Sequence, residues 1–336
     1  MSARITFRYV CDKRMRWGAK RLTDLTPELL QDILAGDPDE LNVHLRLIER
    51  DVVVQDCKVR LHCHCLAVDA NGRIKIARLA EFMRAMLADY AIPKNKMQAA
   101  RARDSKYHSS GAVIQLYHEA LNLFTDLAKT GEGGEMLLYL LSERFLKMPQ
   151  VLCKMDLKTD TSMHYHGADG VYARVTPDGV IKLYWGESKI YSDASDAIRD
   201  CLNSLSPFLL DPDEEHAGRE RDLLLLSDKA DLSDETLTKA FRQYFDKTSP
   251  LSNRVQYCGV ALVGFDADFY PNEDTAVTAD EIASSAKAAL TKWTKQIGNR
   301  ISQEKLANFE IEFLCIPMPS AAAFREAFLG ALGKKQ

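Results

Sequence analysis

The sequence predicts an α/β fold with a mixed sheet flanked by helices, and three observations lead to this expectation. Apolar residues recur at helical spacing over 111–128. Two segments rich in β-branched and aromatic residues surround a short turn within 170–186, which predicts an antiparallel hairpin. Apolar strands at 254–265 and 309–316 are separated by a predicted helix at 278–298, and this alternation is typical of α/β proteins.

The segment before residue 110 predicts a small N-terminal α/β unit. Thr26 is placed to cap a helix with Pro27 in its first turn, and a later amphipathic helix should end near Pro93. We therefore expect an N-terminal unit at 1–110 and a core with a C-terminal extension at 111–336, without a firm boundary between them. In chain order, the elements predicted in the first unit are a helix at 26–35, a strand at 58–69, a turn at 69–72 and a helix at 76–91.

The rest of the chain predicts alternating helices and strands. Apolar periodicity and flanking turn residues define them. The helices are expected at 111–128, 134–148, 194–208, 219–227, 233–246, 278–298 and 320–332, and the strands at 170–175, 180–186, 254–265 and 309–316. The last two strands should extend the sheet of the hairpin, and an acidic loop is expected at 211–216.

Composition indicates a folded protein of ordinary type. The 336 residues are 46% hydrophobic and 27% charged, without an apolar run of membrane-spanning length or a signal peptide after Met1, so we expect a cytoplasmic protein. Eight cysteines lack Cys-x-x-Cys spacing, which favours reduced thiols. The chain has no Gly-rich phosphate loop ending in Gly-Lys-Ser/Thr, so any motor function must come from another protein.

The formal net charge of −4 argues against strong autonomous nucleic-acid binding, because cations supply most non-specific affinity. One segment, 94–106, is locally basic, with five cations against Asp104. It is either a phosphate-contacting arm or a solvated linker, and charge patterning alone favours the linker.

The hairpin is expected to bring carboxylates together at one end of the sheet. Its turn at 176–179 has a proline early and a glycine late. Counting outward from this turn, Asp169 falls opposite Gly186 or Glu187, depending on whether Gly179 forms a bulge. In either register two like charges meet, which is destabilising unless a cation neutralises them.

A divalent metal with oxygen ligands suits this arrangement. Mg²⁺ prefers carboxylate and carbonyl oxygens, so Asp169, Glu187 and the Ser188 carbonyl are candidate ligands. Glu187 and Lys189 point to the same face of a strand, and Lys189 can then orient or deprotonate the attacking water. The structural alternative is a surface salt bridge between Glu187 and Lys189, with Asp169 as a turn residue.

These residues resemble a known family signature. Asp169, a hairpin and then Glu187-x-Lys189 are similar to the motif of the PD-(D/E)XK nuclease superfamily, with Ala168 where the motif has proline. That superfamily often carries a glutamate on the preceding helix, and Glu135 matches it. The longer runs 163–171 and 186–191 resemble the HamA nuclease subunit family of the bacterial Hachiman antiphage defence system.

The resemblance implies a restriction-endonuclease-like core and a metal-dependent deoxyribonuclease. Asp169 and Glu187 would bind Mg²⁺ or Mn²⁺, Lys189 would assist the water, and Glu135 would be an auxiliary ligand or base. It also implies DNA as the substrate and a complex with a superfamily 2 helicase, HamB, that restrains or directs cleavage. Two alternatives stay open: a non-catalytic scaffold that docks a helicase or nucleic acid, and a stand-alone restriction or repair nuclease.

Two histidine-containing segments are further candidate sites. His62 and His64 should face one side of a strand and Cys63 and Cys65 the other, so they cannot converge on one zinc ion. His164 and His166, just before Asp169, could contact a phosphate or a metal-bound water. Hydrogen-bonded strand histidines explain the second pair equally well.

Overall fold

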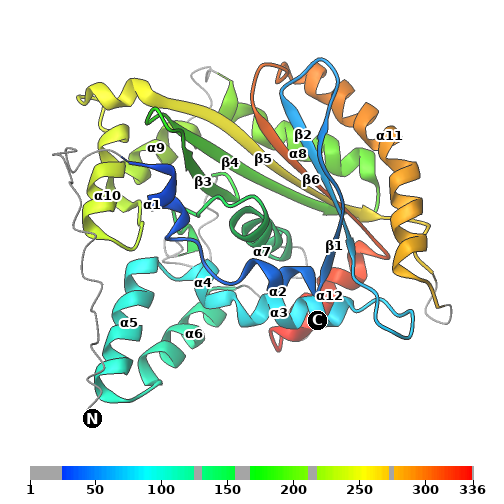
Figure 1. Cartoon of the computed structure of the whole chain (residues 1–336), viewed down its shortest axis with the longest axis horizontal. Coiled ribbons are helices and arrows are strands. Elements are labelled where there is room, and N and C mark those ends of the chain that lie inside the picture. The colour runs from blue at the N-terminus through cyan, green and yellow to red at the C-terminus, as the bar shows by residue number, and fades with distance from the viewer. Residues whose placement is uncertain (1–24, 125–130, 156–166, 211–217, 272–275, 335–336) are drawn as a thin grey trace, which may run out of the picture.

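The structure is a computed structural model of the chain, and it describes residues 25–124, 131–155, 167–210, 218–271 and 276–334. Within this part, one six-stranded sheet runs through the molecule, with helices on both of its faces (Figure 1). Cys11, His164, His166 and the predicted acidic loop at 211–216 lie outside the described residues.

The sheet is mixed, with the strand order β1-β2-β6-β5-β4-β3. The strands are β1 (Leu45–Val53), β2 (Val59–Leu66), β3 (Gly170–Val175), β4 (Ile181–Tyr191), β5 (Val255–Asp266) and β6 (Ile311–Met318). The outer pairs β1–β2 and β3–β4 are antiparallel, and the pairs between them are parallel. The predicted α/β class and mixed sheet are therefore confirmed.

Strands from both halves of the chain share this sheet. β5 and β6 extend the sheet of the hairpin, as predicted, and β2 from the first 110 residues pairs with β6. The division into two units at residue 110 stays a prediction. β1 was not predicted, because the burial of this edge strand does not follow a simple alternation and its pairing with β2 is shifted twice.

Helices pack on opposite faces of the sheet. They are α1 (Pro27–Gln31), α2 (Pro38–Asn42), α3 (Ile76–Ala85), α4 (Leu87–Ala91), α5 (Lys94–Tyr107), α6 (Gly111–Leu123), α7 (Glu132–Leu140), α8 (Ala194–Leu209), α9 (Gly218–Lys229), α10 (Glu235–Arg242), α11 (Ala279–Gln303) and α12 (Ala321–Ala331). A π-helical turn, η1 (Leu141–Phe145), continues α7. None of the described helices is both long enough and apolar enough to span a bilayer.

The middle of β4 is enclosed by α7 and α8. Gly134 of α7 lies against Ser188, and a side chain at Gly134 would approach the Ser188 hydroxyl to 3.1 Å. On the alternate positions of β4, Trp185 packs on Phe208 of α8, with ring centroids 5.4 Å apart. Because successive strand residues face opposite sides, α7 and α8 cover opposite faces of the segment that carries the predicted site.

Three predicted segments before residue 110 are organised differently in the structure. The helix predicted at 26–35 ends at Gln31, because Gly36 adopts a positive φ of 76° and Pro38 starts a new helix. The helix predicted at 76–91 is divided at Met86 into α3 and α4. The basic segment at 94–106 is not a linker but most of α5, and its Asp104 accepts hydrogen bonds from the first turn of α6 at 3.0 and 2.9 Å.

Candidate active site

The hairpin pairs regularly from Val175–Ile181 to Gly170–Gly186, with a bulge at Gly179 in its turn. Gly170 pairs with Gly186, and the N–H of Asp169 donates to the Gly186 carbonyl at 2.7 Å. Gly179 supplies the turn, with φ of 76°. The bulged turn gives the register that, continued, would set Asp169 opposite Glu187. The bond from its N–H instead places Asp169 beside Gly186, the residue before Glu187 on β4.

Glu187 and Lys189 form an ion pair at the inner end of the site. The Lys189 Nζ lies 3.3 Å from the Glu187 Oε2, and Glu187 is only 4% exposed. Burial and the neighbouring Asp169 carboxylate raise the pKa of Glu187 well above its ordinary value, although Lys189 opposes them. Burial by itself would lower the pKa of Lys189, but Glu187 and Asp169 raise it, so the ammonium keeps its proton at neutral pH. The surface salt bridge that the sequence offered as an alternative does not describe this pair, because the Glu187 carboxylate is buried.

Asp169 is held by the residue that follows Glu187. Its Oδ2 accepts hydrogen bonds from the backbone N–H and the hydroxyl of Ser188, both at 2.8 Å. These two bonds fix the carboxylate next to β4. Ser188 thus contributes two donors that the sequence does not predict, and the role of its carbonyl as a ligand stays a prediction.

Glu135 lies in the first turn of α7, where it borders the same pocket as Asp169 and Lys189. Its Oε2 accepts a hydrogen bond from the Tyr90 hydroxyl at 3.2 Å, so α4 helps to position it. The pocket has a volume of about 460 Å³. Part of its lining comes from α12, near the end of the chain. The structure therefore brings Glu135, Asp169 and Lys189 to one pocket, whereas Glu187 does not line it and lies buried beside Lys189.

A buried lysine supports this region and was missed by sequence reasoning. The Lys154 Nζ donates to the Ala168 carbonyl, directly before Asp169, and to the Asp222 Oδ2 at 2.8 Å. Its positive charge also lowers the pKa of Glu187. A lone lysine outside any motif gives no signal in the sequence, because only the fold brings it to the hairpin.

We expect Lys154→Met to raise the pKa of Glu187 further, because one of the two cations that favour its charged form is removed. Carbon-detected NMR of the full chain with labelled glutamate would follow the titration of this carboxyl group. Lys182→Met is the matched control, since the Lys182 Nζ pairs with Glu310 at 2.6 Å on the other end of β4. An unchanged titration of Glu187 in Lys154→Met would contradict the assigned role.

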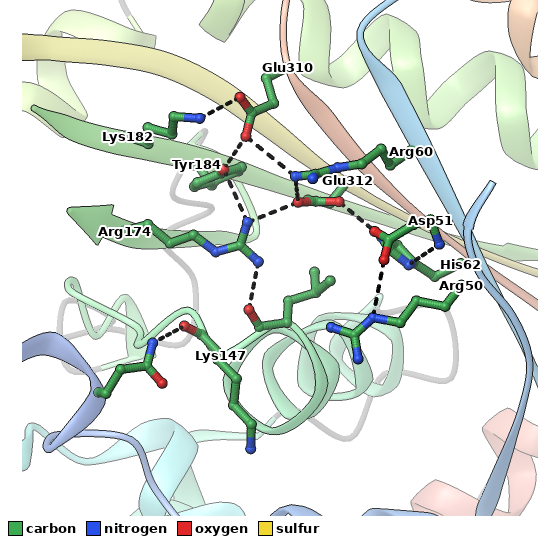
Figure 2. Close-up of polar contacts among 12 residues, drawn as sticks. Arg50, Asp51, Arg60, His62, Lys147, Arg174, Lys182, Tyr184, Glu310 and Glu312 are labelled. Carbon is green, nitrogen blue, oxygen red and sulfur yellow. Dashed lines mark hydrogen bonds and ion pairs between the residues drawn. The ribbon is translucent and has the colours of Figure 1, made fainter. Parts of the chain in front are cut away.

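A second polar cluster lies across β1, β2, β3, β4 and β6 (Figure 2). Among the described residues, the one group of three possible metal ligands with all ligand atoms within 4.8 Å of one another is Asp51, His62 and Glu312. However, Arg60 and Arg174 contact the Glu312 Oε1 at 2.5 and 2.9 Å, and His62 Nε2 lies 2.9 Å from the Oε2. Two guanidinium groups on the same carboxylate disfavour a bound cation, so this cluster is an ion-pair network within the sheet.

The zinc interpretation of the segment 62–65 fails for the predicted reason. His62 and His64 pack on Phe145 from one face of β2, with ring centroids 5.2 and 4.5 Å away. Cys63 and Cys65 are buried in the hydrophobic core. The four side chains alternate along the strand and do not converge.

Comparison with protein families places most of this chain in one of them. The model of the family described as HamA matches residues 42–332. This range includes all six strands and every residue of the site described above. A comparison with curated proteins gives no match.

Proposed function

The chain belongs to the HamA family, and from this membership and the geometry of its site we propose that it is a metal-dependent deoxyribonuclease with a PD-(D/E)XK core. Membership supports a role in antiphage defence. The proposal is supported by Glu135 on α7, Asp169 before β3, and Glu187 and Lys189 within β4. These elements follow one another in the order that the superfamily motif requires.

The observation that carries the proposal is the buried carboxylate of Glu187 between Asp169 and Lys189. Burial is the largest cause of its raised pKa and the Asp169 carboxylate adds to it, and a bound cation would offset both. Within the described residues, Glu135, Asp169 and Glu187 do not bring three ligand oxygens within 4.8 Å of one another. The residues nevertheless fit Mg²⁺ or Mn²⁺, because Mg²⁺ is commonly held by one or two carboxylates and several waters.

Asp169 and Glu187 would hold the metal, and Glu135 would act from the pocket wall as an auxiliary ligand or base. The chemistry that the metal supplies when bound is polarisation of the phosphodiester and compensation of negative charge in the transition state. The two hydrogen bonds from Ser188 hold the Asp169 carboxylate in place. A hydrogen bond from the Tyr90 hydroxyl holds the Glu135 carboxylate. Such fixed groups lower the cost of reorganisation during the reaction.

Lys189 acts in this proposal as a fixed positive charge. The carboxylates beside it raise its pKa, so in the resting site it donates hydrogen bonds and does not accept a proton. It can therefore orient the attacking water and stabilise the charge that develops on the phosphate. Of the two roles foreseen for this lysine, the structure favours orientation over deprotonation.

We further propose that the chain works in a complex with a HamB-like superfamily 2 helicase that restrains or directs cleavage. The family membership supports this, and the chain itself lacks an ATP-binding phosphate loop. Its net charge of −4 also favours a partner that delivers the DNA. Native co-purification with an ATPase, followed by ATP-dependent regulation of cutting, would distinguish this assembly from a stand-alone nuclease.

We expect cleavage of DNA by the purified chain in Mg²⁺ to stop when EDTA is added and to return when excess Mg²⁺ or Mn²⁺ is supplied. Metal binding should also release protons and tighten as the pH rises, because the raised pKa of Glu187 makes a proton compete with the metal. Titration calorimetry in buffers of different ionisation enthalpy measures that release. Cleavage that continues at full rate in EDTA would refute the proposed function.

A further inference from the structure

The wall of the site pocket that comes from the end of the chain carries an arginine. Helix α12 starts after Ser320, whose hydroxyl accepts a hydrogen bond from the N–H of Ala323 at 3.1 Å. Phe324 and Phe328 of this helix press against Gly133 in the first turn of α7, where an added side-chain carbon would meet them at 3.3 and 3.2 Å. This close packing fixes α12 beside the catalytic hairpin, and Arg325 then lines the same pocket as Asp169 and Lys189.

The Arg325 side chain is held by a backbone hydrogen bond, and its charge is not compensated by an ion pair within the described residues. Its guanidinium donates a hydrogen bond to the Ile190 carbonyl, directly after Lys189 on β4. Within the described part of the chain, no carboxylate forms an ion pair with it. Lys189 differs, because Glu187 compensates its charge. An arginine has five N–H donors in a planar fork, so one carbonyl contact leaves donors for a further acceptor.

We propose that Arg325 binds a phosphate of the DNA strand next to the phosphodiester at Asp169, Glu187 and Lys189. This inference rests on the proposed function and adds to it a residue that holds the substrate. Guanidinium groups bind phosphate through two parallel hydrogen bonds, and Arg325 is already oriented by the Ile190 carbonyl. The volume of the pocket, about 460 Å³, lies in the range of small-ligand sites, so it can admit part of a nucleotide.

The lining of the pocket matches the two kinds of surface on a nucleotide. Arg325 and Lys189 offer positive charge, whereas Phe328 and Leu329 offer apolar surface for a sugar or a base. The Glu135 and Asp169 carboxylates in the same pocket would repel a phosphate unless cations accompany it. Arg325 therefore lies where a phosphate needs a positively charged partner. Its guanidinium donates to the Ile190 backbone carbonyl and not to a carboxylate.

Binding of a fluorescein-labelled single-stranded oligonucleotide to the full chain tests the proposal. All variants are made in the Glu187→Gln background to prevent cutting, and affinity is measured by anisotropy over a series of salt concentrations. Arg325→Gln keeps a donor for the Ile190 carbonyl but loses the charge. We expect about ten- to a hundredfold weaker binding at low salt, and a salt slope smaller by about 0.7.

Two further variants separate phosphate binding from a structural role. Arg325→Lys keeps the charge and should keep most of the salt slope. Arg46→Gln makes the same charge change at an exposed arginine that pairs with Asp280, and it should leave the slope unchanged. Thermal unfolding of each variant shows whether the fold persists.

The inference is overturned if Arg325→Gln binds with the affinity and slope of its parent, if Arg325→Lys loses as much as Arg325→Gln, or if the parent shows no DNA binding at low salt. Failure of the proposed function gives a different result. In that case the unmodified chain does not cut DNA in Mg²⁺, whatever residue stands at 325.

Discussion

DNA cleavage in Mg²⁺ is expected to fall by at least about 10³-fold when Glu187 and Lys189 are both replaced by alanine, because the proposed metal ligand and a fixed positive charge are lost together. The fold should persist. Glu187 and Lys189 neutralise each other across 3.3 Å, so removing both leaves neither member of the pair as an isolated charge. The measurements are the initial rate of cutting and the circular dichroism spectrum.

The chain offers a matched control for this double substitution. Glu235 and Lys239 form an exposed ion pair at 2.6 Å on α10, remote in sequence from the hairpin. Their joint replacement by alanine removes the same atoms and should leave cutting unchanged. If the Glu187 and Lys189 variant degraded DNA as fast as the parent, the assignment of the active site would be wrong, and a non-catalytic scaffold would be the better description.

The second large effect concerns stability. Glu312→Ala is expected to lower the free energy of unfolding by about 3–5 kcal/mol, because the substitution breaks a buried ion-pair network. Glu312 is 1% exposed, and its carboxylate contacts Arg60, Arg174 and the buried His62 (Figure 2). Urea unfolding at neutral pH measures the loss. Glu235→Ala, at an exposed site, should leave the unfolding free energy unchanged.

The effect of Glu312→Ala should depend on pH. Burial would raise the pKa of Glu312, but His62 and the guanidinium groups of Arg174 and Arg60 together lower it from 4.5 to about 2. A carboxyl group with a lowered folded-state pKa stabilises the protein above its unfolded pKa. That stabilisation is lost as the pH falls through the folded value. The difference between parent and variant should therefore be full above pH 4.5 and shrink toward pH 2. A constant difference over this range would exclude the proposed ion pairing.

Local sequence patterns predicted the hairpin and the central residues of the site. The turn at 176–179 and the alternation along β4 were enough to place Asp169 opposite the strand that carries Glu187 and Lys189. These residues lie within a short stretch of chain, so turn chemistry and side-chain period largely decide their geometry. The resemblance to the HamA family, first suggested by the same stretch, is confirmed by the family match.

The supporting residues could not be predicted in the same way. Tyr90, Lys154 and Arg325 reach the site from three separate parts of the chain, and only the tertiary packing brings them to the hairpin. The strand β1 escaped detection because edge strands need not show a clean alternation of buried and exposed residues. Charge patterning also misjudged α5, since a basic run does not distinguish a solvated helix from a linker.

The place of β6 in the sheet has a consequence for synthesis of the protein. β6 is the last strand to be made, yet it lies between β2 and β5 and so joins the early hairpin to the later strands. A nascent polypeptide that stops before residue 311 has two separate strand groups with no bridge between them, and it also lacks α12. Nearly the whole chain must therefore be synthesised before the sheet is continuous and before α12 can complete the lining of the pocket.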